Sequence, residues 1–129
     1  MTEYENLYLF HNKKCSKSRN VKKFLDEKNL IYKIIDYLNE PIDLKILHET
    51  IKCLGTKPNN FIRTNEMLFK NVKNDIQLFD EKNLVDLILK YPPLLQRPIV
   101  SKEKNNKIIQ SLVCRPPELI ETFLLNKNC

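Results

Sequence analysis

Cys15 lies between a short apolar segment and the start of a helical pattern, inside the polar run HNKKCSKSRN. The first turn of a helix carries free backbone N–H groups and the positive end of the helix dipole, which favour a thiolate and also bind anions. His11 and Arg19, each four residues from Cys15, add a proton partner and a charge partner. These residue types predict a reactive thiolate in an anion-binding loop, an arrangement suited to nucleophilic attack on an oxyanion.

The arginines are the second group with a chemical signature. Lys and Arg total 22, and only four of them are arginine, namely Arg19, Arg63, Arg97 and Arg115. In a chain that otherwise uses lysine for surface charge, each arginine suggests a specific role, because the planar guanidinium binds an oxyanion through two parallel hydrogen bonds. An internal salt bridge is the alternative, and the residue type alone favours neither.

The cysteine pattern argues against a metal site and against a disulfide scaffold. The four cysteines form no CxxC pair, and the two histidines have no metal-ligand spacing, so we expect no bound metal. Cys53 falls among the apolar positions of a predicted helix, where we expect a buried small side chain. Cys114 stands beside Arg115, as a strand-end core residue or as a second thiol near the site.

Composition bounds the class of protein. The 129 residues, 42% hydrophobic and 29% charged, predict a single domain over 1–129, with no apolar run long enough to cross a bilayer and no signal peptide. One glycine, Gly55, excludes a P-loop and a GxGxxG nucleotide site. The net charge of +6 is spread along the chain, which favours a solvated surface over a nucleic-acid interface. We therefore expect a cytoplasmic monomer without nucleic-acid or membrane partners.

The first third of the chain predicts a strand, a helix and a second strand. Residues 6–11 and 30–36 form apolar segments of strand length, and between them Val21, Phe24 and Leu25 have helical spacing up to about residue 29. Ser16 or Ser18 is the predicted N-cap of this helix. A right-handed βαβ unit with parallel strands follows.

The rest of the chain predicts a helical middle and a closing ββα unit. Helices are expected at 43–54, ended by Gly55, at one or two places within 59–74, and at 81–90. Residues 99–101 and 107–113 predict a hairpin around the polar turn SKEKNN, and 118–125 a last helix. The order is that of an α/β, thioredoxin-like βαβ…ββα core with helices inserted between its two halves.

Several motifs together resemble the glutaredoxin-dependent arsenate reductases. They are HNxxCSxSR at 11–19, DYLxxP at 36–41, RPIV at 97–100 and RPPE at 115–118, with the region of Arg63 matching the segment that carries the first anion-binding arginine of the family. The resemblance covers nearly the whole chain. The proline often found after HN in the family is Lys13 here, which leaves the loop less rigid.

The resemblance implies a role for each matching residue. Cys15 corresponds to the nucleophile that forms a thioarsenate adduct and His11 to the histidine that supports its low pKa. Arg63, Arg97 and Arg115 would hold the oxyanion. Ser18 and Arg19 lie in the active-site loop, where they would bind the substrate and orient the loop. Arsenate is then the substrate, glutathione the co-substrate and glutaredoxin the protein partner, with no tightly bound cofactor. The resemblance also suggests a cis Arg97–Pro98 peptide bond near the thiol.

Two other functions stay open on the same fold. One is a glutathione-dependent thiol reductase of unknown substrate, which arsenate binding would separate from an arsenate reductase. The other is an Spx-type regulator that binds RNA polymerase. Redox-sensing members of that class usually carry CxxC, whereas this chain has Ser18 at the second position, which argues against a dithiol switch.

Overall fold

A four-stranded sheet organises the chain, for which a computed structural model describes residues 4–55, 60–63, 66–72 and 80–125. The strand order is β2-β1-β3-β4. Strand β1 (Asn6–Phe10) pairs in parallel with β2 (Lys33–Ile35) across α1 (Ser16–Glu27). Strand β3 (Ile99–Lys104) pairs antiparallel with β1 and with β4 (Lys107–Val113).

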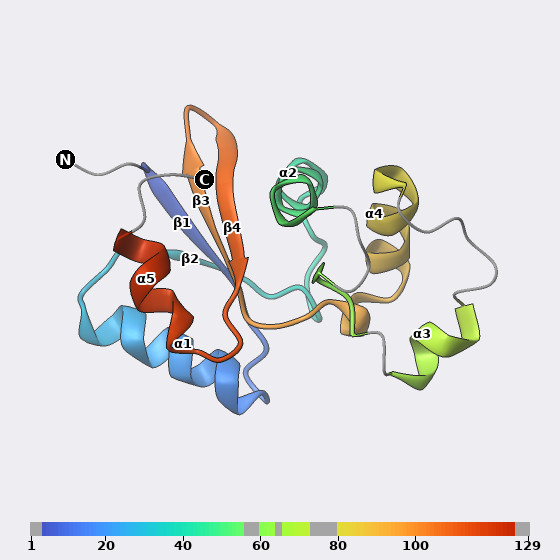
Figure 1. The fold of residues 1–129 in the computed structure, drawn as a ribbon, viewed down its shortest axis with the longest axis horizontal. Helices are drawn as coiled ribbons and strands as arrows, with labels where there is room; N and C mark the ends of the chain where they lie inside the picture. The colour runs from blue at the N-terminus through green and yellow to red at the C-terminus, as the bar shows by residue number, and fades with distance from the viewer. Residues whose placement is uncertain (1–3, 56–59, 64–65, 73–79, 126–129) are drawn as a thin grey trace.

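The remaining helices come between β2 and β3 and after β4. The first group is α2 (Leu44–Leu54), α3 (Met67–Val72), α4 (Glu81–Lys90) and the short 3-10 helix η2 (Pro92–Leu94), and α5 (Leu119–Leu125) ends the described chain. Helices α1 and α5 lie together on one side of the sheet, and α2 and α4 lie on the other (Figure 1). This confirms the predicted βαβ, helical middle and ββα order. None of the helices in the described ranges has the length and apolar character needed to span a membrane.

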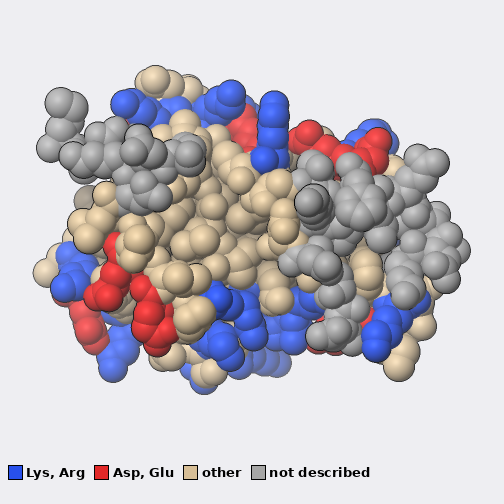
Figure 2. Space-filling view, viewed as in Figure 1, with Lys and Arg blue, Asp and Glu red and all other residues tan. Residues whose placement is uncertain are grey.

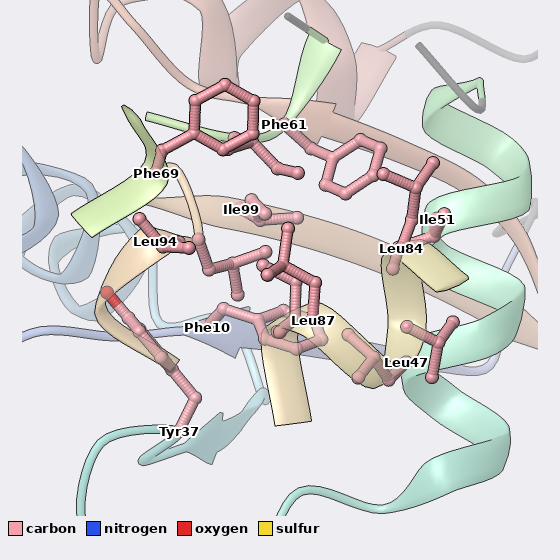
Figure 3. Close-up of a cluster of buried hydrophobic side chains, with 14 residues drawn as sticks. Phe10, Tyr37, Leu47, Ile51, Phe61, Phe69, Leu84, Leu87, Leu94 and Ile99 are labelled. Atoms are coloured by element: carbon pink, nitrogen blue, oxygen red, sulfur yellow. The ribbon is translucent and has the colours of Figure 1, made fainter. Parts of the chain in front are cut away.

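Alternation along β1 and β3 builds a hydrophobic cluster on each face of the sheet. Leu7, Leu9 and Val100 pack toward α1 and α5, whereas Phe10 and Ile99 pack toward α2 and α4. The α2–α4 side also takes in Phe61, Phe69 and Leu94 from the inserted segment (Figure 3). Each fully buried side chain of this size contributes about 1.5–3 kcal/mol, so the two clusters hold the helices against the sheet.

The structure confirms the glycine end predicted for α2 but not the serine cap predicted for α1. Asp43 and Asp80 cap α2 and α4, accepting from the N–H of Ile46 and Asn83 respectively. Gly55 ends α2 at φ 92°, as expected. The prediction of a serine N-cap for α1 is wrong.

Cys15 occupies the N-cap of α1 and makes no side-chain capping bond. Neither serine can occupy the N-cap position, because Ser16 is already the first helical residue and Ser18 is buried within the first turn. The serine hydroxyl of residue 18 bonds outside the helix, to the loop before it.

Strand lengths differ from the predictions at both ends of the sheet. The strand predicted at 30–36 is only Lys33–Ile35, whereas β3 runs on to Lys104 through residues predicted as a turn. The turn is Asn105–Asn106, both at positive φ. Lys102 was expected in the turn but is 1% exposed, since its ammonium donates to Phe123 O and Gln110 Oε1 beneath α5.

Two further expectations concern the helices of the inserted segment and the burial of Cys53. The one or two short helices predicted within 59–74 correspond to α3 at Met67–Val72, whereas Ile62 makes an isolated antiparallel bridge with Leu95. Residues 56–59, 64–65 and 73–79 lie outside the described ranges. Cys53 was predicted to be buried and is exposed. Its position near the end of α2 turns its thiol toward the edge of β4, where it lies 3.5 Å from Ile108 O.

Candidate active site

One edge of the sheet gathers the residues predicted to do chemistry. Strands β1 and β2 are parallel and end together, with Phe10 paired to Ile35. The loop that carries Cys15 and the segment that begins with Tyr37 therefore leave the sheet side by side. The N–H of His11 still donates to Ile35 O at 3.1 Å, which fixes the start of the loop.

Strands β3 and β4 bring two arginines to the same edge. Ile99 pairs with Phe10 on one side and with Val113 on the other, so Arg97 precedes this edge and Arg115 follows it. Arg115 Nη1 donates to Arg97 O at 3.0 Å, which ties the two segments together. The Arg97–Pro98 peptide bond is cis, as predicted, and so is the bond between Arg115 and Pro116.

The Cys15 thiol lies at the start of α1 among donors. Burial raises its pKa, but the backbone N–H of Ser18, the Arg97 guanidinium and the backbone N–H of Lys17 together lower the pKa below the ordinary thiol value. Each of these groups binds the thiolate better than the thiol. The helix start thus acts as the sequence suggested, and Arg97 supplies the charge.

Ser18 locks the loop that carries the thiol. Its fully buried hydroxyl accepts from the N–H of Asn12 at 3.0 Å and forms a 2.6 Å hydrogen bond with His11 Nδ1. Burial and the charge of Lys22 lower the pKa of His11, so its ring is mostly neutral at pH 7. His11 is not among the groups that lower the pKa of Cys15, and its ring forms a hydrogen bond with Ser18 instead.

The four arginines occupy different settings. Arg97 reaches Cys15, and its Nε is buried without a hydrogen-bond partner among the described residues. Arg63 is partly exposed and pairs with Glu66 Oε1 at 2.7 Å. Arg19 donates to Lys13 O at 2.9 Å and braces the loop from outside. Arg115 is bound to Arg97 O, so among the four arginines it is Arg97 that contacts the thiol.

Tyr37 is a site residue that the sequence reasoning missed. Its side chain is 1% exposed, and its hydroxyl proton has no acceptor within hydrogen-bond distance in the described part of the chain, while a hydrogen bond from the Asn12 side chain lowers its pKa. Burial raises its pKa to about 12, and Arg97, Cys15 and Arg63 are all close enough to shift that pKa. The motif DYL was visible, and a tyrosine directly after a parallel strand would have pointed to this edge.

Comparisons with known proteins identify the family. Residues 10–123 match the ArsC family. The chain belongs to the ArsC family. It is 35% identical over 117 residues to the arsenate reductase of Neisseria meningitidis, covering 90% of this chain and 96% of that protein.

Structural and regulatory relatives extend the comparison. An arsenate reductase structure from Vibrio cholerae superposes with a TM-score of 0.76 at 26% identity, covering 94% of this chain and 99% of the other, which confirms the thioredoxin-like fold. The global transcriptional regulator Spx 1 of Oceanobacillus iheyensis is 28% identical over 100 residues, covering 78% of this chain and 76% of the regulator. The relatives of the ArsC chain thus include proteins named arsenate reductases and a protein named a transcriptional regulator.

The surface beside the thiol of this ArsC chain is basic and hollowed. Lys and Arg side chains gather below the sheet, around the start of α1 (Figure 2). A groove of about 730 Å³ lies beside the loop, with basic, acidic and apolar residues in its lining: His11, Asn12, Lys13, Lys14, Lys22, Ile34, Asp36, Leu38 and Asn39. An anionic molecule in this groove would lie next to the Cys15 loop.

The other described thiols of the ArsC chain lie elsewhere. Cys114 is fully buried, and burial raises its pKa to about 12, so it is protonated at neutral pH. This matches its interpretation as a strand-end core residue. Cys53 lines a separate groove of about 560 Å³ between α2 and β4, with His48 and Glu81. Within the described ranges no three metal-ligating side chains come together.

Proposed function

We propose that this ArsC-family chain reduces arsenate to arsenite through a thioarsenate adduct on Cys15, with glutathione as co-substrate and glutaredoxin as partner. The observation that carries the proposal is the contact between the Arg97 guanidinium and a thiol whose pKa is lowered. A thiolate beside a fixed cation suits attack on a tetrahedral oxyanion. The choice of arsenate as the substrate comes from the relatives that are named arsenate reductases.

The first step joins sulfur to arsenic. The Cys15 thiolate attacks the arsenic atom, an As–S bond forms, an As–O bond breaks, and the oxygen leaves as water or hydroxide. Arsenic remains pentavalent. Arg97 neutralises charge on the remaining oxygens, and in this proposal Arg115 and Arg63 complete the arginine set, with Arg63 exchanging Glu66 for the substrate.

The second step moves the electrons. The glutathione thiolate attacks Cys15 sulfur and forms a mixed disulfide, while the As–S electron pair stays on arsenic and arsenite departs. Two thiols are oxidised to one disulfide, and arsenic(V) is reduced to arsenic(III). A glutaredoxin thiolate then attacks the glutathione sulfur, which releases the Cys15 thiolate.

The loop residues position this chemistry. Ser18 holds Asn12 and His11, and Arg19 holds the Lys13 carbonyl, so the turn before the thiol is fixed at both ends. His11, neutral and bonded to Ser18, supports the thiol through the shape of the loop. The groove beside Lys13 and Lys14 has the volume and charge for a tripeptide with two carboxylates. We expect the enzyme to act in the cytoplasm as a monomer.

A coupled assay tests the proposal. NADPH oxidation is followed with arsenate, glutathione, glutathione reductase and glutaredoxin, and each component is omitted in turn. We expect turnover that needs arsenate, falls steeply without glutaredoxin and disappears in Cys15→Ser. Cys53→Ser, which changes an exposed thiol in another groove, is the matched control and should keep full activity. Arsenate-independent oxidation by the folded protein would contradict the proposal.

A transcriptional regulator is the second candidate, because an Spx protein is among the relatives. A thiol reductase of unknown substrate is the third, since the same low-pKa thiol would serve it. Co-purification with RNA polymerase, undiminished in Cys15→Ser, would favour the regulator. Reduction of glutathione mixed disulfides without any arsenate turnover would favour the thiol reductase.

A further inference from the structure

We propose that Tyr37 is a substrate-binding residue, whose hydroxyl donates a hydrogen bond to the oxyanion held between Cys15 and Arg97. The proposal rests on the function proposed above and deepens it. It adds a neutral donor to a site that the sequence motifs describe only through charged arginines and the loop.

The starting observation is a pair of unsatisfied donors. Tyr37 Oη and Arg97 Nε are both buried, and neither has a hydrogen-bond acceptor among the residues that the structure describes. Nearly all buried polar groups in native proteins are paired, because an unpaired one has lost its water without a replacement. Both unsatisfied donors lie in the surroundings of the same thiol. A ligand with acceptor oxygens would satisfy both at once.

The strand register explains why Tyr37 faces the site. Phe10 pairs with Ile35 at the end of the parallel strands, so the segments leading to Asn12 and Tyr37 run out together. The tyrosine ring packs into the cluster of α2 and α4 residues, and its hydroxyl oxygen lies at the margin of that cluster, away from Leu47 (Figure 3). The ring is therefore anchored in this cluster, and Cys15, Arg97 and Arg63 lie close enough to the hydroxyl to shift its pKa.

The chemistry of the two donors fits an oxyanion. A pKa of about 12 keeps the phenol protonated, so it donates and does not add negative charge near the substrate. Arg97 also offers only N–H groups. Two buried donors select a ligand whose oxygens accept, such as a tetrahedral arsenate anion.

Binding without turnover tests the role. Cys15→Ser prevents adduct formation, and arsenate binding to this variant is compared with binding to Cys15→Ser/Tyr37→Phe by titration calorimetry. We expect the phenylalanine variant to raise the arsenate Kd about ten- to a hundredfold, the worth of one hydrogen bond to a charged group. In turnover, Tyr37→Phe should raise KM for arsenate and leave KM for glutathione unchanged.

A stability measurement separates binding from a structural role. Because the hydroxyl proton has no acceptor among the described residues, Tyr37→Phe should unfold in urea at the same concentration or a higher one. Tyr32→Phe is the control, since Tyr32 Oη donates to Asp26 at 2.6 Å on the surface and should not affect arsenate binding. Equal arsenate affinity with and without the Tyr37 hydroxyl overturns only the tyrosine role. No arsenate binding to Cys15→Ser itself overturns both this role and the proposed substrate.

Discussion

The Cys15 thiol is governed by a few donors that outweigh its burial. Burial alone would raise its pKa, and the Ser18 N–H, the Arg97 guanidinium and the Lys17 N–H reverse that effect. Two of the three are backbone groups of the helix start, which a side-chain substitution leaves in place. Arg97 is therefore the residue through which the acidity of the thiol can be changed.

Replacing Arg97 should make Cys15 less acidic. We expect Arg97→Gln to move the titration of the thiolate, followed by its ultraviolet absorbance, to higher pH. The lowered pKa keeps the thiolate present below the ordinary thiol pKa, so the variant should alkylate with iodoacetamide several-fold more slowly at pH 7. Arg19→Gln removes a guanidinium that donates to the Lys13 carbonyl and does not shift the pKa of Cys15, so the thiol of this variant should titrate as in the parent.

Removing the Ser18 hydroxyl should loosen the loop. Ser18→Ala leaves the Asn12 N–H and His11 Nδ1 without their partner, and we expect a loss of about 1–3 kcal/mol in the free energy of unfolding. Urea denaturation measures it. Ser16→Ala, an exposed serine in the same helical turn, should change stability by much less. Equal losses in the two variants would contradict the account of the loop.

The chemistry of a residue was predictable where its amino-acid type and its position in the sequence were enough to indicate it. Cys15 at a helix start and a few arginines among many lysines were visible without a structure, and the structure brings Arg97 and Arg115 to the same edge. The motif that contains Tyr37 was visible too, but the role of this residue was not, because it depends on the register between β1 and β2 and on the lack of an acceptor for its hydroxyl proton among the described residues. Such long-range facts have no local signal.

The elements are fixed at their ends by short-range chemistry. Aspartate caps begin α2 and α4, and Gly55 ends α2 with φ 92° and ψ 147°, a region that L side chains rarely adopt. A Cβ at this position would also lie 2.8 Å from Asn60 Nδ2, which donates to Leu54 O. Both the backbone and its neighbour therefore require glycine here.

Substituting Gly55 should destabilise the chain measurably. We expect Gly55→Ala to lower the free energy of unfolding by about 1–3 kcal/mol, read from urea denaturation. The double variant Gly55→Ala/Asn60→Ala removes the close contact and should keep most of the loss relative to Asn60→Ala alone. Full recovery in the double variant would show that the contact, and not the positive φ, sets the cost.

Element order was predictable, and element length was not. Apolar periodicity located the helices, but β3 continues through Lys102 and Glu103, which look like turn residues. The side chain of Lys102 is buried beneath α5, where its ammonium donates to the carbonyl of Phe123, so a charged residue fills a core position. Only the packing of α5 reveals this.

At the scale of the whole molecule, one group of basic side chains lies beside the thiol. The net charge of +6 is diffuse in sequence, and in the folded chain basic side chains gather around the start of α1 as well as at the opposite end of the view (Figure 2). Lys13 and Lys14 line the groove beside the thiol. The fold therefore places part of a widely spread positive charge next to the Cys15 loop.

Reversing charge in the groove should weaken the co-substrate and spare arsenate. We expect Lys13→Glu/Lys14→Glu to raise KM for glutathione several-fold, with little change in KM for arsenate, in the coupled assay. The effect should shrink with added salt, because the side chains are exposed. Lys82→Glu, on α4 and away from this groove, is the matched control. A glutathione KM unchanged by the double reversal would remove the groove from the account.

The central claim is that Cys15 is a thiolate inside an oxyanion pocket. The most direct measurement is the rate at which iodoacetamide labels Cys15 at pH 7, followed by peptide mass spectrometry with and without arsenate. The account predicts labelling faster than that of the free glutathione thiol, slowed by arsenate in a saturable way, with Cys114 unlabelled in the folded chain. Labelling at the rate of an ordinary thiol, unaffected by arsenate, would contradict it.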